Sequence, residues 1–189
     1  MKIKNVIKLA AELVGRLDIS EYLDNGLTED VSASKEDVDR FLSAYNSALL
    51  FTASEFEPLS AFYRAEGVDS VLFSDLKDRA IGVISVKDEM GNELDYEIKI
   101  DRLAFKKQQS VAIVCYRYLP EDRGLDGETD YGLASKITPR VLAYGTAAEF
   151  CQMSGDVAGY KQWREKFERG ALACVRPRGK LLLPKRRWY

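Results

Sequence analysis

The sequence predicts an α+β protein: a four-helix bundle with an antiparallel β-rich insert between its second and third helices and an extended basic C-terminal arm. Apolar residues recur at helical spacing towards both ends of the chain, and between about residues 60 and 118 the period changes from 3.6 to 2. We expect the helical bundle over 1–59 and 136–175, the insert over 60–118, an acidic loop over 119–135 and the arm over 176–189.

Two amphipathic helices are predicted before the insert. The first carries an apolar stripe from Ile3 to Leu17 and is expected to continue to a stop near Asp24-Asn25-Gly26. The second is expected to begin at Ser34, where an acidic residue stands at the third helical position, and to end before Pro58. Its apolar face is predicted to consist of Val38, Phe41, Leu42, Tyr45, Ala48 and Leu49.

The insert is predicted to form short strands over 71–73, 80–86, 93–100 and 110–118, with a turn over 88–92 between the second and the third. In the third strand Leu94, Tyr96, Ile98 and Ile100 alternate with charged residues, which favours an antiparallel sheet with one face in water. The strand over 110–118 is the most apolar, so we expect it at the centre of the sheet.

Two further helices are predicted after the acidic loop. Thr138 is expected to cap the first, with Pro139 at its first position and Ile137 packing against Leu142. This helix should end at Ser154-Gly155. Asp156 should then cap the last helix, whose stripe consists of Tyr160, Trp163, Phe167, Ala171 and Cys174; such a stripe is typical of a core.

The composition restricts the chemistry available to the protein. The 189 residues include no histidine, which excludes Ser-His-Asp and Cys-His catalysis and histidine-bearing zinc sites. Three widely spaced cysteines, Cys115, Cys151 and Cys174, favour small buried hydrophobic residues over a disulfide framework. No glycine-rich phosphate-binding motif is present, and we expect neither a signal peptide nor a membrane-spanning helix.

Charge is distributed unevenly along the chain. The last fourteen residues carry six Lys/Arg and no acid, and subtracting these six leaves 22 Lys/Arg against 30 Asp/Glu, a net charge of −8. The arm can be interpreted as a strap that docks on a partner, as a solvated tail, or as a nucleic-acid-binding segment. We favour the strap, because Leu181–Leu183 and the terminal Trp188-Tyr189 suit burial and an acidic body is a poor partner for DNA.

Two motifs have residue types that could bind a metal ion. Glu97-Ile98-Lys99, with Asp88 upstream, has the pattern by which some nucleases hold a divalent cation and activate water, although the same residues also fit the solvated face of a strand. The loop from Asp122 fails as a twelve-residue calcium loop, because Gly124 and Leu133 occupy ligand positions. We interpret it as a solvated acidic loop or as a docking surface for a neighbour's basic arm.

Several blocks resemble the head–tail connector proteins of tailed phages and prophages. Asn46–Leu59 is similar to their second-helix exit, and Ile137–Gly155 resembles their third helix. Trp163–Phe167 and Lys185–Trp188 extend the resemblance, so that it covers about 45–59 and 136–189. The order helix–helix–β insert–helix–helix–arm is similar to that of the tail tubular A adaptors of short-tailed phages.

This resemblance implies a structural adaptor of the virion, made in the host cytoplasm, and not an enzyme. Members of the family form rings, twelve-fold, below the portal around the DNA channel. The implied partners are the portal protein, a downstream tail or head-closure protein and further copies of the chain, with DNA only as passing cargo and with no cofactor, metal or membrane. The alternative is a nucleic-acid-associated protein or metal-dependent nuclease that uses the basic arm and Glu97/Lys99.

The expected contact residues follow from this assignment. The acidic loop is expected to lie near the lumen or the next ring, through Asp122, Asp126, Glu128 and Asp130. Contact with the portal or the neighbouring subunit is expected through the arm residues Arg176, Arg178, Lys180, Leu181, Leu182, Leu183, Lys185, Arg186, Arg187, Trp188 and Tyr189.

Overall fold

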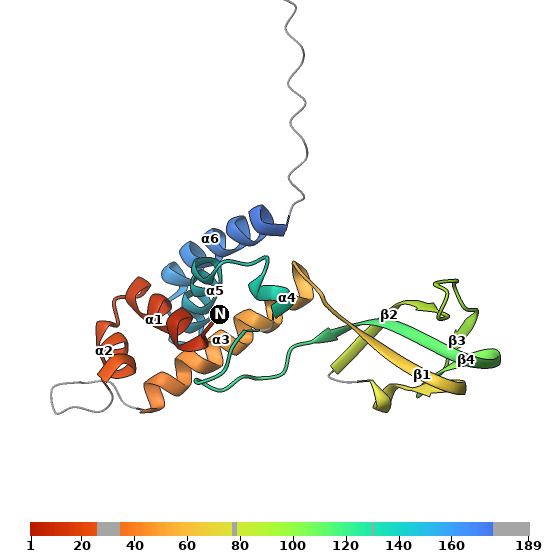
Figure 1. Ribbon diagram of the computed structural model, residues 1–189. Coiled ribbons are helices and arrows are strands. Elements are labelled where there is room, and N and C mark those ends of the chain that lie inside the picture. Colours follow the sequence, from red (N-terminus) through yellow and green to blue (C-terminus); the bar gives the residue numbers. More distant parts are fainter. Residues whose placement is uncertain (26–34, 77–78, 130, 176–189) are drawn as a thin grey trace, which may run out of the picture.

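The computed structural model describes residues 1–25, 35–76, 79–129 and 131–175 and has a helical lobe and a sheet lobe, which projects from it (Figure 1). The helices are α1 (Ile3–Leu13), α2 (Leu17–Asn25), α3 (Lys35–Glu55), α4 (Tyr131–Ala134), α5 (Pro139–Met153) and α6 (Val157–Val175). The strands are β1 (Leu59–Leu72), β2 (Arg79–Lys87), β3 (Tyr96–Ile98) and β4 (Arg102–Leu119), with a 3-10 turn over Phe73–Asp75. The predicted α+β class is confirmed.

The sheet is antiparallel throughout, in the order β1-β4-β2, and β3 also pairs with β4. The predicted central strand is therefore confirmed. β1 is much longer than the predicted strand over 71–73, because Ala61, Tyr63 and Ala65 give a weak apolar signal but lie opposite Tyr116, Val114 and Ala112 of β4. Pairing along β4 extends both strands beyond what their own residues indicate.

The third predicted strand, over 93–100, is wrong in its length and in part of its buried face. Only Tyr96–Ile98 pairs with β4, and the chain then turns, with the N–H of Lys99 donating to the carbonyl of Arg102 at 2.9 Å. Ile98 is 63% exposed and Ile100 fully exposed, because nothing among the described residues forms a second layer over this part of the sheet. The predicted turn over 88–92 is confirmed: Gly91 has a φ of +86° and Asp88 N–H donates to the carbonyl of Asn92.

The first predicted helix is divided in two at Gly15. Gly15 has a φ of +78°, its N–H donates to the carbonyl of Glu12, and the N–H of Arg16 donates to the carbonyl of Ala11. These two bonds form a Schellman motif, which ends α1 and lets α2 turn back on it. The prediction of one continuous helix from Ile3 to Asp24 is therefore wrong. The spacing of apolar residues does not show that a single glycine adopts the left-handed conformation and ends the helix.

The starts of the last two long helices follow the sequence prediction. Thr138 Oγ1 accepts a hydrogen bond from the N–H of Val141, with Pro139 at the first helical position. Asp156 Oδ1 accepts from the N–H of Gly159 at 2.9 Å, after a left-handed Gly155 that ends α5. Ser34, the predicted cap of α3, and Gly26 lie outside the described residues.

Two separate clusters of buried apolar residues form the cores of the two lobes. In the helical lobe α5 packs against α1, α3 and α6, and Phe41 of α3 stacks on Phe150 of α5 with ring centroids 3.9 Å apart. Most of the predicted stripe of α6 belongs to this core: Phe167 and Ala171 are fully buried, and Trp163 and Cys174 pack against it, whereas Tyr160 is not part of the cluster. The sheet lobe has a smaller core on one face of the sheet, built around Leu103, Val114 and Tyr116.

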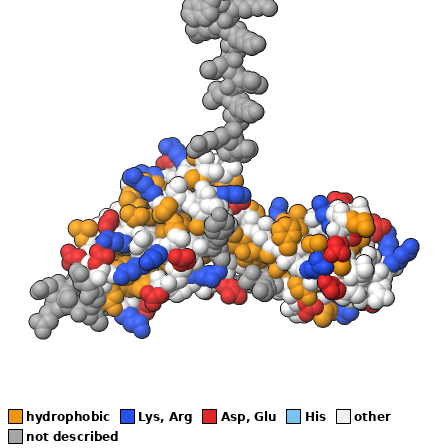
Figure 2. Space-filling model, viewed as in Figure 1, with side chains coloured by type: hydrophobic (Ala, Val, Ile, Leu, Met, Phe, Trp, Pro, Cys, Tyr) orange, Lys and Arg blue, Asp and Glu red, His pale blue; other side chains and the backbone are white. Residues whose placement is uncertain are grey.

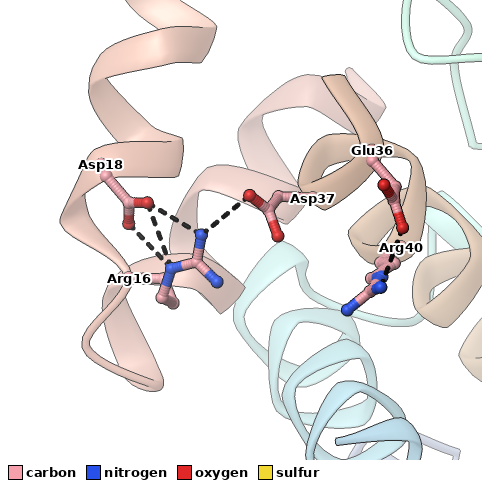
Figure 3. Close-up of polar contacts among 5 residues, drawn as sticks. All are labelled: Arg16, Asp18, Glu36, Asp37 and Arg40. Atoms are coloured by element: carbon pink, nitrogen blue, oxygen red, sulfur yellow. Dashed lines mark hydrogen bonds and ion pairs between the residues drawn. The ribbon is translucent and has the colours of Figure 1, made fainter. Parts of the chain in front are cut away.

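Arg16 connects the first two helices to α3 (Figure 3). Its guanidinium bonds both carboxylate oxygens of Asp18, with Nη2 to Oδ2 at 2.8 Å, and pairs with Asp37 of α3 at 3.3 Å. Hydrogen bonding to Arg16 lowers the pKa of Asp18. Arg16 therefore fixes the corner between α1 and α2 against the beginning of α3.

We expect Gly15→Ala to lower the free energy of unfolding by about 1–2 kcal/mol, the cost of a left-handed conformation for a residue with a Cβ. No atom lies within 4 Å of the added Cβ, so the cost comes from the backbone alone. Urea unfolding followed by the helical circular dichroism signal measures it. Gly15→Asn should cost less, and equal midpoints for all three proteins would contradict the assigned turn.

We expect Glu149→Gln to stabilise the protein at pH 7 by less than about 1 kcal/mol. Burial raises the pKa of Glu149, and Arg164, 3.1 Å away, offsets only part of that effect. A raised pKa in the folded state means that the ionised carboxylate destabilises the protein above that pKa, so the advantage of Gln should vanish as the pH falls to about 4.

The control for this prediction is Glu168→Gln, which removes a charge from the same Arg164 at a more exposed position. It should lower the unfolding free energy slightly or leave it unchanged at pH 7. Urea unfolding at both pH values measures both variants, and a loss of stability in Glu149→Gln at pH 7 would show that the ion pair dominates over the cost of burial.

Candidate interaction surfaces

Most of the sequence-predicted contact residues lie outside the described residues. These are Asp130 of the acidic loop and the whole predicted contact set of the arm: Arg176, Arg178, Lys180, Leu181, Leu182, Leu183, Lys185, Arg186, Arg187, Trp188 and Tyr189. Asp122, Asp126 and Glu128 are described, and all three are exposed.

The backbone of the acidic loop is held against the helical lobe. Asn46 of α3 bonds Arg123 twice: its Oδ1 accepts from the N–H of Arg123 at 3.0 Å, and its Nδ2 donates to the carbonyl of the same residue at 3.2 Å. The hydroxyls of Tyr45 and Thr129 lie 2.6 Å apart, and both side chains are buried. The acidic segment, interpreted from the sequence as a solvated loop or as a docking surface, is thus anchored on the helical lobe, and we call it the acidic ridge.

The beginning of the chain anchors the same ridge from the other side. The N–H of Ile3 donates to the carbonyl of Gly127 at 3.2 Å, and the N–H of Thr129 donates to the carbonyl of Met1 at 2.9 Å. Within the expected loop the chain also forms the single-turn helix α4, where Leu133 is fully buried. Burial of this leucine brings the end of the segment back to the core, which the acidic composition did not indicate.

An open groove lies between the outer face of α3 and this ridge. Its volume is about 410 Å³, and its lining residues are Asp39, Leu42, Ser43, Asn46, Ser47, Leu50 and Asp122. Leu42 was predicted on the core-facing side of α3; it is only partly buried and also lines the groove. Sequence analysis missed Asp39 and Leu50, although Leu42 and Leu50, eight residues apart on a helix, share one face.

The sheet lobe exposes several large apolar side chains, and Figure 2 shows apolar side chains among charged ones on its visible surface. Phe62 is 74% exposed and Met90 is 90% exposed. Ile81 and Ile84 are about half exposed, at the two irregularities of the β2–β4 register. An apolar hollow of about 240 Å³ is lined by Phe73, Leu76, Ala80, Ile81, Gly82, Val83, Ile98 and Tyr116.

The residues of the nuclease hypothesis are dispersed on the surface of the sheet lobe. Glu97 and Lys99 are exposed, with Glu97 on β3 opposite Ala104. Asp88 accepts hydrogen bonds within its own turn, from Asn92 and from the N–H of Met90, and the bond from Asn92 lowers its pKa. Within the four described stretches, no group of three His, Cys, Asp or Glu side chains is placed to hold a metal ion.

The cysteines follow the predicted packing role to different degrees. Cys151 is buried in α5, and burial, with Asp156 beside it, raises the pKa of its thiol to about 11. A thiol with such a pKa is protonated at neutral pH and is a poor nucleophile. Cys115 and Cys174 are partly buried and reduced.

No protein-family model matches the chain, and no curated protein has a significant match to it. In the described part of the chain, none of the helices combines the length and the apolar composition that crossing a bilayer requires.

We expect Asn46→Ala to release the acidic ridge and to cost about 1–2 kcal/mol, because it removes two hydrogen bonds and leaves backbone groups of Arg123 unpaired. Hydrogen exchange at the Arg123 amide, together with urea unfolding, measures the effect. The neighbouring exposed Ser47→Ala should change neither quantity. Full protection of the Arg123 amide in Asn46→Ala would refute the anchoring role of Asn46.

Proposed function

We propose that this protein is a structural head–tail connector of a tailed bacteriophage, a ring-forming adaptor that binds below the portal around the DNA channel. The proposal derives from the resemblance of 45–59 and 136–189 to such adaptors. The observation that carries it furthest is the division of the described chain into a helical lobe and a projecting sheet lobe with separate cores (Figure 1).

An elongated subunit of this kind suits a ring. A subunit in a closed ring uses two different surfaces, one for each neighbour, and so needs adhesive patches on opposite parts of the molecule. Exposed side chains such as Phe62, Ile81 and Ile98 give the sheet lobe apolar surface for contact with another protein. In the helical lobe, the groove beside α3 supplies a second, more polar surface.

The charge distribution is compatible with DNA passing by the protein without binding to it. Asp122, Asp126 and Glu128 form an exposed acidic ridge, and a surface of this sign repels phosphates. In the proposed assembly this ridge lies near the lumen or the next ring. In the same proposal, the four-helix bundle, the β insert and the arm follow one another in the order that the resemblance to such adaptors implies.

The basic arm is proposed to make the attachment. It contains six Lys/Arg, three successive leucines and a terminal Trp188-Tyr189, a composition suited to burial in a partner with acids around the edge. No catalytic step, cofactor or metal enters the proposed function. Its partners are the portal protein, the next tail or head-closure protein and further copies of the chain.

We expect the full-length protein to form rings on portal particles, and deletion of 176–189 to abolish attachment because the docking segment is lost. Electron microscopy and co-sedimentation with portal measure both. The truncated protein must retain the circular dichroism spectrum and the monomeric mass of a folded chain, which shows that attachment and not folding was lost.

Two outcomes would contradict this proposal. Unchanged assembly of the truncated protein on portal would remove the arm from the attachment. Salt-dependent DNA binding, or DNA nicking that requires a divalent metal and is lost in Glu97→Gln, would favour the nucleic-acid-associated alternative.

A further inference from the structure

We propose that the groove between α3 and the acidic ridge receives the basic arm of a second copy of this chain, so that adjacent ring subunits are joined head to tail. The groove is the hollow lined by Asp39, Leu42, Asn46, Leu50 and Asp122 together with Ser43 and Ser47. The inference rests on the proposed ring and names the partner of the arm within it.

Carboxylates near the groove lack the cations that neutralise most others in the helical lobe. In the first turns of α3, Glu36 pairs with Arg40 at 2.9 Å and Asp37 with Arg16 at 3.3 Å (Figure 3). Asp39, on the same helix, forms no ion pair within the described residues. The same holds along the adjoining ridge for Glu121, Asp122, Asp126 and Glu128.

Elsewhere in the lobe the carboxylates are mostly compensated. Glu57 pairs with Lys136, Asp24 with Lys8, and Glu149 and Glu168 with Arg164. Asp39 and Asp122, neither of which has an ion pair among the described residues, thus line the groove together. The cation within the ridge, Arg123, is half-buried, and its backbone is bonded to Asn46.

The groove also offers apolar surface beside Asp39 and Asp122. Leu50 is 38% exposed, and Leu42 is partly buried in the floor beside Asn46. A ligand that fits this surface has cations on both sides of a short apolar segment. The arm has this order, with Lys180 before Leu181–Leu183 and Lys185-Arg186-Arg187 after them.

The position of the groove favours the arm of another copy. The groove residues lie on the face of α3 opposite Phe41, Tyr45 and Ala48, which pack into the core towards α5. The last described residue, Val175, ends α6, which packs on the other side of α5 (Figure 1). The arm of each copy therefore begins at the end of α6, whereas the groove of the same copy lies on the outer face of α3.

The arm is long enough to reach a neighbour. Fourteen extended residues span at most about 46–50 Å, which exceeds the width of a single helical lobe of this size. Because the arm and the groove are different surfaces, the contact is heterologous, and repetition of it around an axis closes a ring.

The first experiment measures whether the arm binds the groove. A fluorescein-labelled peptide of residues 176–189 is titrated with full-length protein in which R186E/R187E lowers the side-chain net charge of the protein's own arm from +6 to +2. We expect saturable binding that weakens as salt is raised, and roughly tenfold weaker binding when D39N/D122N is added to the same protein.

The matched control is E21Q/E55Q, which removes two exposed carboxylates that form no ion pair among the described residues and lie outside the groove. It should leave peptide binding unchanged. Absence of peptide binding, or equal weakening by the two pairs of substitutions, would overturn the inference.

The second experiment distinguishes a neighbour's arm from the chain's own. The D39K/D122K protein has an unaltered arm, but the reversed charges in its groove should prevent the groove from binding an arm. The R186E/R187E protein has an unaltered groove, but its own arm should no longer bind. Each alone should be monomeric in analytical ultracentrifugation, and the mixture should form dimers. If the mixture stays monomeric at concentrations where the peptide saturates the groove, the contact between copies is refuted.

Failure of this inference is distinguishable from failure of the proposed function. If D39N/D122N leaves ring formation on portal intact and the peptide does not bind the groove, the connector function stands and the arm binds elsewhere. If the peptide binds the groove but the full-length protein does not bind portal particles, the contact between copies stands and the connector function fails.

Discussion

Close approach of three helices around α5 is the contact on which the helical lobe depends. A Cβ at Gly145 would lie 3.0 Å from Phe167 of α6 and 3.2 Å from Ala48 of α3, so a methyl group at this crossing would force its neighbours to shift by a few tenths of an ångström. Phe167 is fully buried and meets Phe51 and Phe56 in tilted or edge-on contacts. Because the backbone of α5 is enclosed in this way, α3 and α6 are held on either side of it, and their outer faces become the surfaces available to partners.

The sheet lobe follows a different principle. In the described part of the chain it is a single antiparallel sheet, in which β4 pairs with β1, β2 and β3. One face carries the small core around Val114, and no described residue covers Phe62 or Ile100, which are exposed. Large exposed apolar patches are uncommon on soluble monomers, and they commonly mark surfaces that another protein covers. In the proposed ring, the helical lobe therefore contributes the rigid packing around α5, and the sheet lobe contributes apolar surface for contact with other subunits.

The charges of the acidic ridge favour one orientation of a basic partner on the helical lobe. Asn46 of α3 bonds the backbone of the acidic ridge, Tyr45 bonds Thr129 within it, and Asp122 lines the groove together with Asp39. An anchored ridge loses little conformational entropy when a partner binds, so opposite charge on an incoming arm can be used for affinity and orientation. The sequence separation between Asp39 and Asp122 explains why sequence analysis found the acidic loop but not the groove.

The sequence by itself determined the α+β class, the central place of the strand ending near Tyr118 and the caps at Thr138 and Asp156, because periodicity and capping act over a few neighbouring residues. The sequence likewise shows that the C-terminal arm is basic and that the rest of the chain is acidic. Tertiary structure alone decided the division at Gly15, the length of β1, the exposure of Ile98 and Ile100 and the groove beside α3. Each of these depends on what packs or pairs across a long stretch of chain, and a local pattern contains no information about the partner that is present or missing.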